Sequence, residues 1–281
     1  MSEAAVAAPP LRLLAQGPGW RASDVVCRLG PADRPFEERH ERVSIAAVLE
    51  GTFQYRSANG RGLLYPGAVM LGNPGTCYEC GHEHGVGDHC LALQYEPDDF
   101  GEIARGAGSR GFRFRTAMLP ALRHLAAPLA RLQGRAARVA KEGADALALE
   151  ESVVEVAEAV VCAAAGTTVS VAQPGARDQR RISRALRHLE AHAVRRLSLD
   201  ELARVACMSK YHFLRCFRRI VGMTPHVFLV DLRLRRAAAA LRATKLPVAR
   251  VAFDAGFGDL SEFHGQFRTA FGASPGRFRS A

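Results

Sequence analysis

The clearest structural pattern in the chain is carried by two segments: LDELARVACMSKYHFLRCFRRIVGMTP at residues 199–225 and PVARVAFDAGFGDLSEFHGQFRTAFGASPGRFR at residues 247–279. Each predicts a short apolar helix, a tight turn and a second helix that carries polar side chains on one face. Each closes with a glycine, two further residues and a proline. The repetition predicts an all-α C-terminal domain that contains two helix-turn-helix units in tandem.

In the first unit we expect residues 199–206 to form the supporting helix and residues 210–220 to form the helix that reads DNA, with Ser209 as its N-cap. Phe213 and Phe217 are four residues apart and should face the core. The opposite face supplies the candidate DNA contacts. These candidates are Ser209, Lys210, Tyr211, Leu214, Arg215, Arg218 and Arg219.

Side-chain chemistry divides these candidates by role. Arg215 can make the bidentate contact to guanine in the major groove, and Tyr211 can pack on a sugar or a thymine methyl group. Arg218 and Arg219 are better suited to phosphate contacts on the flank of the helix. Taken alone, each arginine is equally consistent with a solvated surface charge.

The second unit repeats the first. Val248 and Val251 mark the supporting helix, residues 256–258 form the turn, and Asp259 or Ser261 caps the second helix. The phenylalanine spacing of the first unit recurs in this helix. The candidate DNA contacts of the second unit are Ser261, Glu262, His264 and Arg268.

Over residues 180–279 the chain resembles the AraC/XylS family of bacterial transcription regulators. The residues that carry the resemblance are Ala203, Met208, Ser209, Phe213, Phe217, Gly222, Pro225, Arg233, Leu234, Ala237, Ala252, Gly256, Phe257, Phe263, Phe267, Gly272, Pro275, Phe278 and Arg279. The resemblance implies a sequence-specific regulator, such as an activator, that binds double-stranded DNA through two recognition helices in successive major grooves. It also implies RNA polymerase and a second copy of the chain as partners.

One position departs from the family pattern. The family often has a basic residue where this chain has Gly265. A glycine offers no side-chain contact and weakens a helix by ~1 kcal/mol relative to alanine. We therefore expect the second unit to bind with little base reading of its own.

The N-terminal part is expected to be mostly β. Short runs rich in β-branched residues over residues 1–100 are separated by turn signals, among them a predicted hairpin at Glu50-Gly51 and a turn at Asn59-Gly60. The family resemblance implies a cupin-like β-barrel sensor here. The expected fold class is therefore α+β with several domains.

Helices should follow this β region over residues 101–166, with a kink or a break at Pro128. A linker is expected at residues 167–179 and the DNA-binding domain at residues 180–281. One helical face in the segment before the linker could hold two copies of the chain together, or it could simply cover the barrel. The residues of this face are Val153, Val156, Val160 and Val161.

Three cysteines and three histidines lie within residues 77–90. Thiolates and imidazoles favour zinc, copper or iron, so the candidate ligands are Cys77, Cys80, His82, His84 and Cys90. If the thiols are free, Cys77 and Cys80 could form a redox-sensitive disulfide. The alternatives are residues of strands and loops without a metal, or polar groups of a pocket for a small-molecule effector. The cofactor is therefore left open.

Charge separates the two parts of the chain. Residues 179–281 hold 20 Lys and Arg against 7 Asp and Glu, a net charge of +13, whereas residues 1–178 have a net charge of −3. This asymmetry indicates a polyanion partner for the C-terminal part.

The chain shows no signal peptide and no apolar run of transmembrane length, so we expect a cytoplasmic protein without a membrane partner. A fused DNA-binding domain makes sensing a simpler role than catalysis, so we expect no enzyme. The open alternatives are a metal- or thiol-dependent cupin enzyme with an accessory DNA-binding domain, and a non-specific architectural DNA binder.

Overall fold

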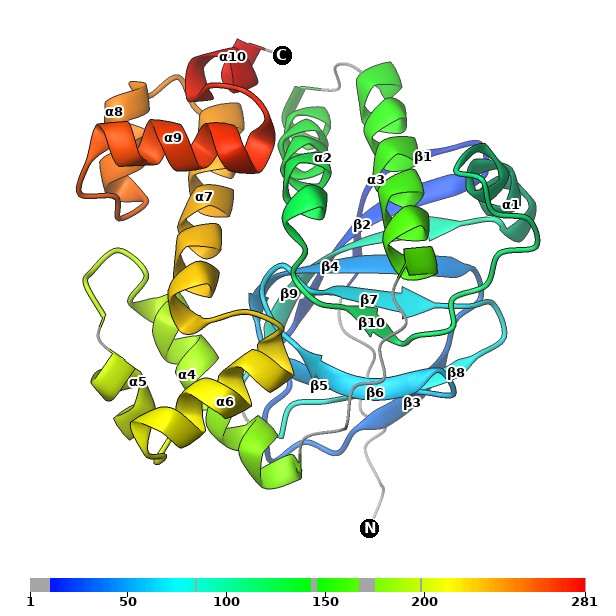
Figure 1. Ribbon diagram of the computed structural model, residues 1–281. Helices are drawn as coiled ribbons and strands as arrows, with labels where there is room; N and C mark the ends of the chain where they lie inside the picture. Colours follow the sequence, from blue (N-terminus) through cyan, green and yellow to red (C-terminus); the bar gives the residue numbers. More distant parts are fainter. Residues whose placement is uncertain (1–10, 84, 143–145, 167–174, 198, 281) are drawn as a thin grey trace.

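The computed structural model describes residues 11–83, 85–142, 146–166, 175–197 and 199–280. Two β-sheets and the helices α1 to α3 form the N-terminal part, and the helices from α4 onward form the C-terminal part (Figure 1). Among the described residues no helix is both long and apolar enough to cross a lipid bilayer.

The β region consists of two antiparallel sheets. One sheet has the order β1 (Leu11–Gly17), β2 (Trp20–Cys27), β9 (Asp88–Tyr95), β4 (Val43–Gly51), β7 (Val69–Gly72) and β10 (Met118–Leu119). The other has the order β3 (Phe36–Arg39), β8 (Cys77–Gly81), β5 (Phe53–Ser57) and β6 (Gly60–Leu64). No ladder between described strands joins the two sheets, so the closed cupin-like barrel that the resemblance implied is not formed.

The chain changes sheet where a hairpin was expected. β4 pairs with β7 and β9, whereas β5 pairs with β6 and β8, so Glu50-Gly51 is a crossover and the hairpin prediction there was wrong. The Asn59-Gly60 turn is confirmed, since it closes the β5–β6 hairpin in which Ser57 pairs with Gly60. The first strand, β1, lies in a segment where no strand was predicted, because its leucines Leu11 and Leu13 are exposed and give no buried face.

Three helices cover the outer face of the six-stranded sheet: α1 (Pro97–Gly106), α2 (Arg123–Glu142) and α3 (Ala146–Gly166). The helix is not broken at Pro128, since α2 continues through it. Pro128 lies near the start of the helix, where a missing backbone donor costs one early hydrogen bond. Val153, Val156, Val160 and Val161 of α3 are fully buried against this sheet and its helices, as expected of a face that covers the β region.

The C-terminal helices are α4 (Ala176–Ala191), α5 (Leu199–Val205), α6 (Lys210–Val221), α7 (Pro225–Ala243), α8 (Val248–Asp254), α9 (Leu260–Phe271) and α10 (Pro275–Ser280). The predicted linker is shorter than expected, because α4 already begins at Ala176; residues 167–174 lie outside the described residues.

The two repeated Gly-x-x-Pro sequences end one helix and begin the next. Gly222 and Gly272 end α6 and α9 with φ values of 81° and 70°, a left-handed conformation that favours glycine. Pro225 and Pro275 are then the first residues of α7 and α10, where no backbone donor is needed.

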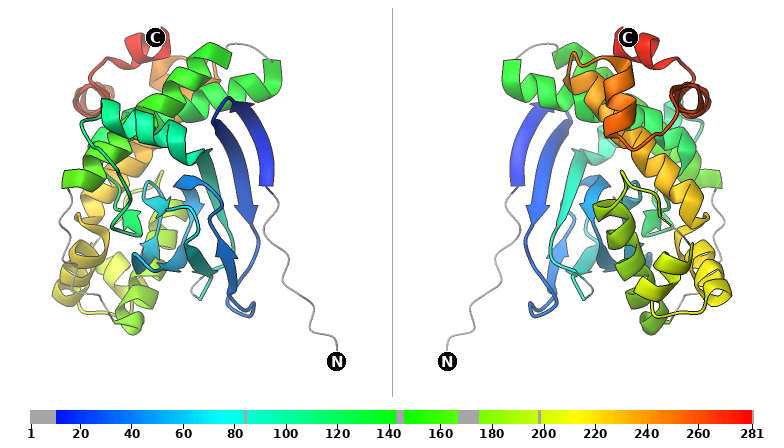
Figure 2. Two further views of the ribbon diagram at one scale, coloured as in Figure 1. Left: turned by 90° about the vertical axis from the view of Figure 1, so that its right-hand side faces the viewer. Right: turned by 90° about the vertical axis from the view of Figure 1, so that its left-hand side faces the viewer.

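The two parts of the chain share one apolar core. Residues of the four-stranded sheet, of α4 and of the first helix-turn-helix unit belong to a single buried cluster. On the other side, α2 lies between α3 and α7 (Figures 1 and 2), and Ala126 and Ala130 of α2 pack with the core of the second unit. The N-terminal part therefore contacts both units, the first through its strands and the second through α2.

Candidate nucleic-acid interface and inter-sheet cavity

The second helix of the first unit is α6. Phe213 and Phe217 are fully buried and fix this helix on its support, as the spacing predicted. Arg218 and Arg219 are exposed, and Arg219 Nη2 lies 3.4 Å from Asp178 Oδ2 of α4. Ser209 is the N-cap residue by its extended backbone, although its side chain accepts no capping hydrogen bond. The backbone of α6 includes four further candidates whose side chains lie outside the described residues: Lys210, Tyr211, Leu214 and Arg215.

The corresponding helix of the second unit is α9. Its N-cap is Asp259, whose Oδ1 accepts a hydrogen bond of 2.6 Å from the backbone N–H of Glu262. Gly265 has open space around it, and as a glycine it contributes no side-chain contact. All candidates on this helix are exposed on its surface: Ser261, Glu262, His264 and Arg268.

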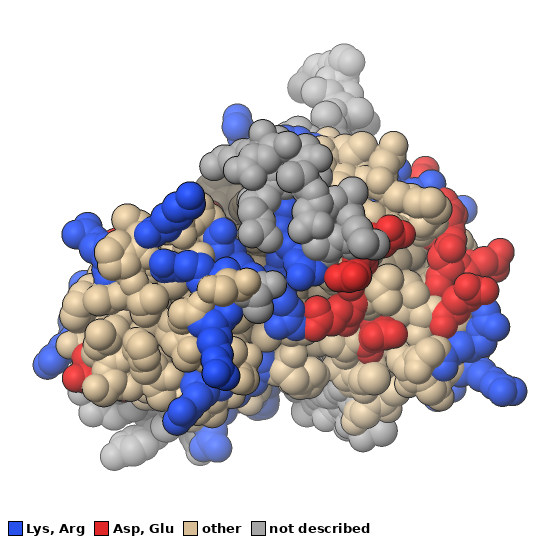
Figure 3. Space-filling model, turned by 90° about the horizontal axis from the view of Figure 1, so that it is seen from above, with Lys and Arg blue, Asp and Glu red and all other residues tan. Residues whose placement is uncertain are grey.

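Charge is unevenly distributed over the face seen in Figure 3. Lys and Arg predominate on the left of that view, where the second unit lies, and Asp and Glu gather on the right, over the N-terminal part. An exposed polar helix within a basic surface is suited to a polyanion such as DNA.

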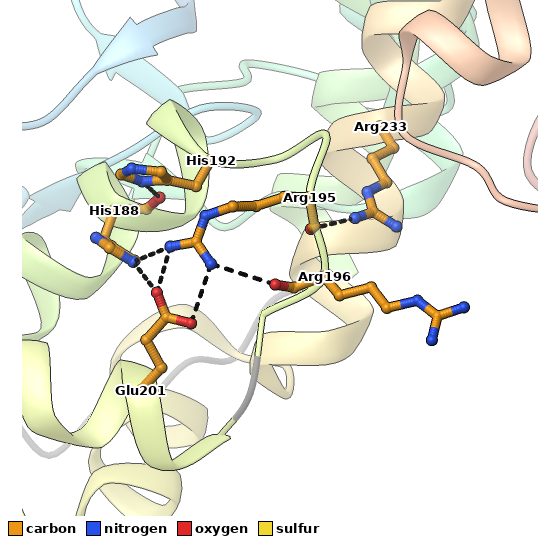
Figure 4. Close-up of polar contacts among 6 residues, drawn as sticks. All are labelled: His188, His192, Arg195, Arg196, Glu201 and Arg233. Carbon is orange, nitrogen blue, oxygen red and sulfur yellow. Dashed lines mark hydrogen bonds and ion pairs between the residues drawn. The ribbon is translucent and has the colours of Figure 1, made fainter.

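An ion-pair network fixes the supporting helix α5 of the first unit to α4 (Figure 4). Glu201 of α5 pairs with His188 of α4, with 2.7 Å between Oε1 and Nε2, and with Arg195 of the α4–α5 connection, with 3.2 Å between Oε2 and Nη1. The hydrogen bonds from Arg195 and then from His188 lower the pKa of Glu201 to about 2. The network therefore positions the first unit relative to α4.

Arg233 links the loop between α4 and α5 to α7, the helix that joins the two units. Its Nε donates to the carbonyl oxygen of Ala193 at 2.6 Å and its Nη2 to that of Arg195 at 2.9 Å. Gly256 in the turn of the second unit has a φ of 96° and lies against this loop. A Cβ at this position would lie 2.7 Å from the Cα of Val194. The α4–α5 loop thus contacts α7 and the turn of the second unit, which fixes the two units relative to each other.

A cavity of about 230 Å³ lies between the two sheets. Alternate residues of β2 and β9 line one wall, and residues of β3, β5 and β8 line the other. Its titratable residues are Cys27, Glu38, His40, Tyr78, Cys80, His82, Asp88 and Cys90. The cavity is lined by strands of both sheets, and one of these strands, β5, also contacts α4 through a hydrogen bond of 2.9 Å from Gln54 to Gln179.

The buried groups at one end of this cavity form a hydrogen-bonded cluster. His82 Nε2 lies 2.6 Å from Asp88 Oδ1, and the Cys90 thiol donates to Asp88 Oδ2 at 3.2 Å. Burial alone would lower the pKa of His82, but the hydrogen bonds to Asp88 and Cys27 outweigh it and raise this pKa to about 9. Burial raises the pKa of the Cys80 and Cys90 thiols, which makes them poor nucleophiles as they stand.

The structure divides the cysteines and histidines that the sequence grouped together. Cys80, His82 and Cys90 line the cavity, whereas Cys77 does not. Cys77 and Cys80 are three residues apart on β8 and so lie on opposite faces of the strand, which disfavours a disulfide between them. His84 lies outside the described residues.

Two members of the cluster, Cys27 and Asp88, were missed. They come from β2 and β9 and are directly paired, Cys27 opposite Asp88. Asp88 lies within the cysteine- and histidine-rich residues 77–90, whereas Cys27 is distant from them in the sequence. Their proximity depends on the pairing of strands that are distant in sequence.

The fold and its surfaces define a two-part protein in which a β region with an internal cavity is joined to a tandem helix-turn-helix domain. A family model described as a helix-turn-helix domain matches residues 202–281. The chain is 35% identical over 98 residues to the HTH-type transcriptional activator AarP of Providencia stuartii, covering 35% of this chain and 73% of AarP. The chain belongs to the AraC/XylS family.

Two further comparisons concern the same part of the chain. It is 38% identical over 82 residues to the RCS-specific HTH-type transcriptional activator RclR of Escherichia coli K12, which is 29% of each chain. A solved AraC-type regulator structure from Chromobacterium violaceum matches at 26% identity and a TM-score of 0.35, over 38% of this chain and 95% of that one. The match to RclR spans less than a third of its length.

Proposed function

We propose that the protein is a sequence-specific transcription regulator that reads DNA with α6 and α9. The observation that carries the proposal is the fixed arrangement of two repeated units around α7. This helix has 19 residues, which at 1.5 Å per residue is a length of ~28 Å. Successive major grooves on one face of B-DNA are ~34 Å apart. Two units joined by this helix can therefore present α6 and α9 to adjacent grooves.

DNA selected from a random pool with the full-length protein tests this proposal. The selected duplexes should bind more tightly than unrelated duplexes, and affinity should fall steeply with salt because bound phosphates release counterions. Equal affinity for all duplexes would instead identify a non-specific architectural binder. No binding to any duplex would refute DNA recognition.

The N-terminal part is proposed to be the sensor, which responds to a small-molecule effector, a metal or a redox signal. The cavity between the sheets, and the shared core of the β region and the first unit, support this role. Changes in the DNA affinity of the full chain when candidate effectors are added test it. An affinity that no addition alters would argue against a sensor.

We also propose that the regulator acts as a homodimer with RNA polymerase, as the family resemblance suggested. The valine face of α3 is buried within the chain, so the dimer contact must use another surface. Sedimentation of the full-length protein at micromolar concentration tests this, and a monomer in the presence and absence of DNA would refute it.

A further inference from the structure

The strongest unassigned feature of the molecule is the buried trio Cys27, His82 and Asp88. One ligand atom from each, the sulfur, an imidazole nitrogen and a carboxylate oxygen, lie within 4.8 Å of one another. All three residues are at most 8% exposed. A thiol, an imidazole and a carboxylate gathered at one buried point are unusual in a core, where apolar side chains pack without desolvating polar groups.

We propose that Cys27, His82 and Asp88 bind a zinc ion at the end of the inter-sheet cavity, and that the ion controls how α4 docks on the β region. The inference rests on the proposed function, because its consequence is a change in DNA affinity. Thiolate, imidazole and carboxylate are all zinc ligands, and three protein ligands leave a fourth position open. Binding releases two protons, one from the Cys27 thiol and one from the His82 imidazolium, because both ligands must be deprotonated to hold the ion.

Cys90 positions the carboxylate ligand. Its thiol donates to Asp88 Oδ2, while Oδ1 of the same carboxylate faces His82. Groups that hydrogen-bond to a metal ligand set its orientation, and their loss typically weakens metal binding by about 10- to 100-fold. Cys90 is therefore assigned a positioning role.

The first connection from this site to the DNA-binding part runs through Gly51 and the loop before β9. Gly51 pairs with Asp88 in the β4–β9 ladder, and its backbone N–H donates to the carboxylate of Glu190 in α4 at 3.2 Å. Gly85 of that loop lies against the guanidinium group of Arg187 of α4, which leaves no room for a Cβ at residue 85. The segment that carries His82 and Asp88 thus contacts α4 directly.

The second connection runs through β5. The Phe53 ring stacks on His82, with 5.9 Å between the ring centroids. Its neighbour Thr52 lies 2.8 Å from Ser183 of α4, hydroxyl to hydroxyl. Successive residues of an extended chain point to opposite sides, so Phe53 faces His82 while Thr52, the residue before it, faces α4. A shift of Phe53 towards or away from His82 therefore also moves Thr52, which holds α4.

A displacement of α4 reaches the first helix-turn-helix unit without an intermediary. His188 of α4 is paired with Glu201 of α5, and Asp178 of α4 is paired with Arg219 of α6. The site can therefore bias the position of α6 relative to α9, and so the match between the two helices and successive grooves.

Metal analysis of the full-length protein tests the ligand assignment. We expect wild type to bind one equivalent of zinc, and cobalt in its place to give a thiolate-to-cobalt charge-transfer band. Cys27→Ser should lose the metal and the band, and Cys90→Ala should keep both with about 10- to 100-fold weaker affinity. Asp88→Asn removes a charged ligand while nearly keeping the shape of the side chain, and it should also lose the metal. This variant tests the assignment if Cys27→Ser does not fold.

Three control variants separate this assignment from others. Cys77→Ser, on the opposite face of β8, and Cys162→Ser, exposed on α3, should keep one equivalent of zinc. Cys216→Ser tests a second trio with Asp178 and His212 between α4 and α6, and it should also keep the metal. Zinc retained by Cys27→Ser and by Asp88→Asn, or lost from Cys77→Ser, would overturn the assignment.

DNA affinity measured with and without zinc tests the regulatory part. We expect a change of about 5- to 150-fold in wild type, the usual range of coupling between two sites. Glu190→Ala should bind zinc normally and show a reduced response, whereas Glu151→Ala, exposed on α3, should respond like wild type. If the protein binds DNA normally and zinc does not change its DNA affinity, the regulatory inference is wrong and the proposed function stands. Absence of DNA binding in every condition would overturn the proposed function.

Discussion

Replacement of Arg233 by alanine should loosen the connection between the two helix-turn-helix units. The change removes two hydrogen bonds from a charged donor, of 2.6 and 2.9 Å, to the carbonyl oxygens of Ala193 and Arg195. Hydrogen bonds to charged groups contribute about 1.5–3 kcal/mol each. Arg233 is partly exposed, so solvent compensates for part of the loss. We expect the free energy of unfolding to fall by ~2–4 kcal/mol in total.

The effect on DNA binding should depend on the length of the duplex. The complete selected site requires α6 and α9 at a fixed separation, so its affinity should fall about 10-fold, which corresponds to ~1.4 kcal/mol. A duplex that contains only the part read by the first unit should bind wild type and Arg233→Ala equally, because Arg233 itself does not belong to the proposed base-reading face.

Arg250→Ala is the matched control. Arg250 lies on the exposed face of α8 and pairs only with Asp254 four residues later among the contacts described, at 2.8 Å. Exposed pairs of this kind contribute ~0.3–0.5 kcal/mol. Urea unfolding and fluorescence anisotropy supply the two measurements. The reasoning is refuted if Arg233→Ala and Arg250→Ala are indistinguishable in both, or if Arg233→Ala weakens the short and complete duplexes equally.

Three further predictions concern single residues. Gly256→Ala should destabilise the protein by at least ~1–2 kcal/mol in urea unfolding, because its φ of 96° suits glycine and a Cβ would meet Val194; an unchanged midpoint would contradict this. Glu201 has a pKa of about 2 in the folded protein against an ordinary 4.5, so the stability difference between wild type and Glu201→Gln should be complete above pH 5 and disappear as pH falls towards 2; a difference that persists at pH 2 would exclude the ion pair as its cause. Arg268→Ala should weaken all duplexes alike and reduce the salt slope by about one, whereas Arg215→Ala should cost ~1–3 kcal/mol at one base pair and relax the selected sequence there.

Local signals account for the helix-turn-helix units, which were predicted almost element by element. Helix starts at Ser209 and Asp259, left-handed glycines at helix ends and phenylalanines four residues apart all act within one or two helical turns. Such features are written in contiguous sequence. The side chains that would contact DNA could be proposed in the same way, since they are the polar residues of the same helices.

The N-terminal part could be predicted only as β-rich. Glu50-Gly51 has the composition of a hairpin, yet β4 and β5 find partners elsewhere in the chain, which sequence proximity cannot reveal. The same limit applies to the cavity. Cys27 and Asp88 become neighbours only through the β2–β9 register, and the strand period that separates Cys77 from Cys80 matters only once β8 is known to be a strand.

The Tyr65-Pro66-Gly67 turn limits how the N-terminal and C-terminal parts of such regulators can be exchanged. The Tyr65 hydroxyl donates to the carbonyl of Val221 at the end of α6, and Arg235 of α7 donates to the carbonyl of Pro66. The turn thus holds the last residue of one recognition helix and the helix that follows it. A chimera that grafts another sensor onto these DNA-binding helices has to supply an equivalent turn, or it exposes part of a core that the two parts built together. The N-terminal part and the DNA-binding part are therefore expected to diverge as a matched pair, with exchange between relatives working only when the junction is exchanged as well.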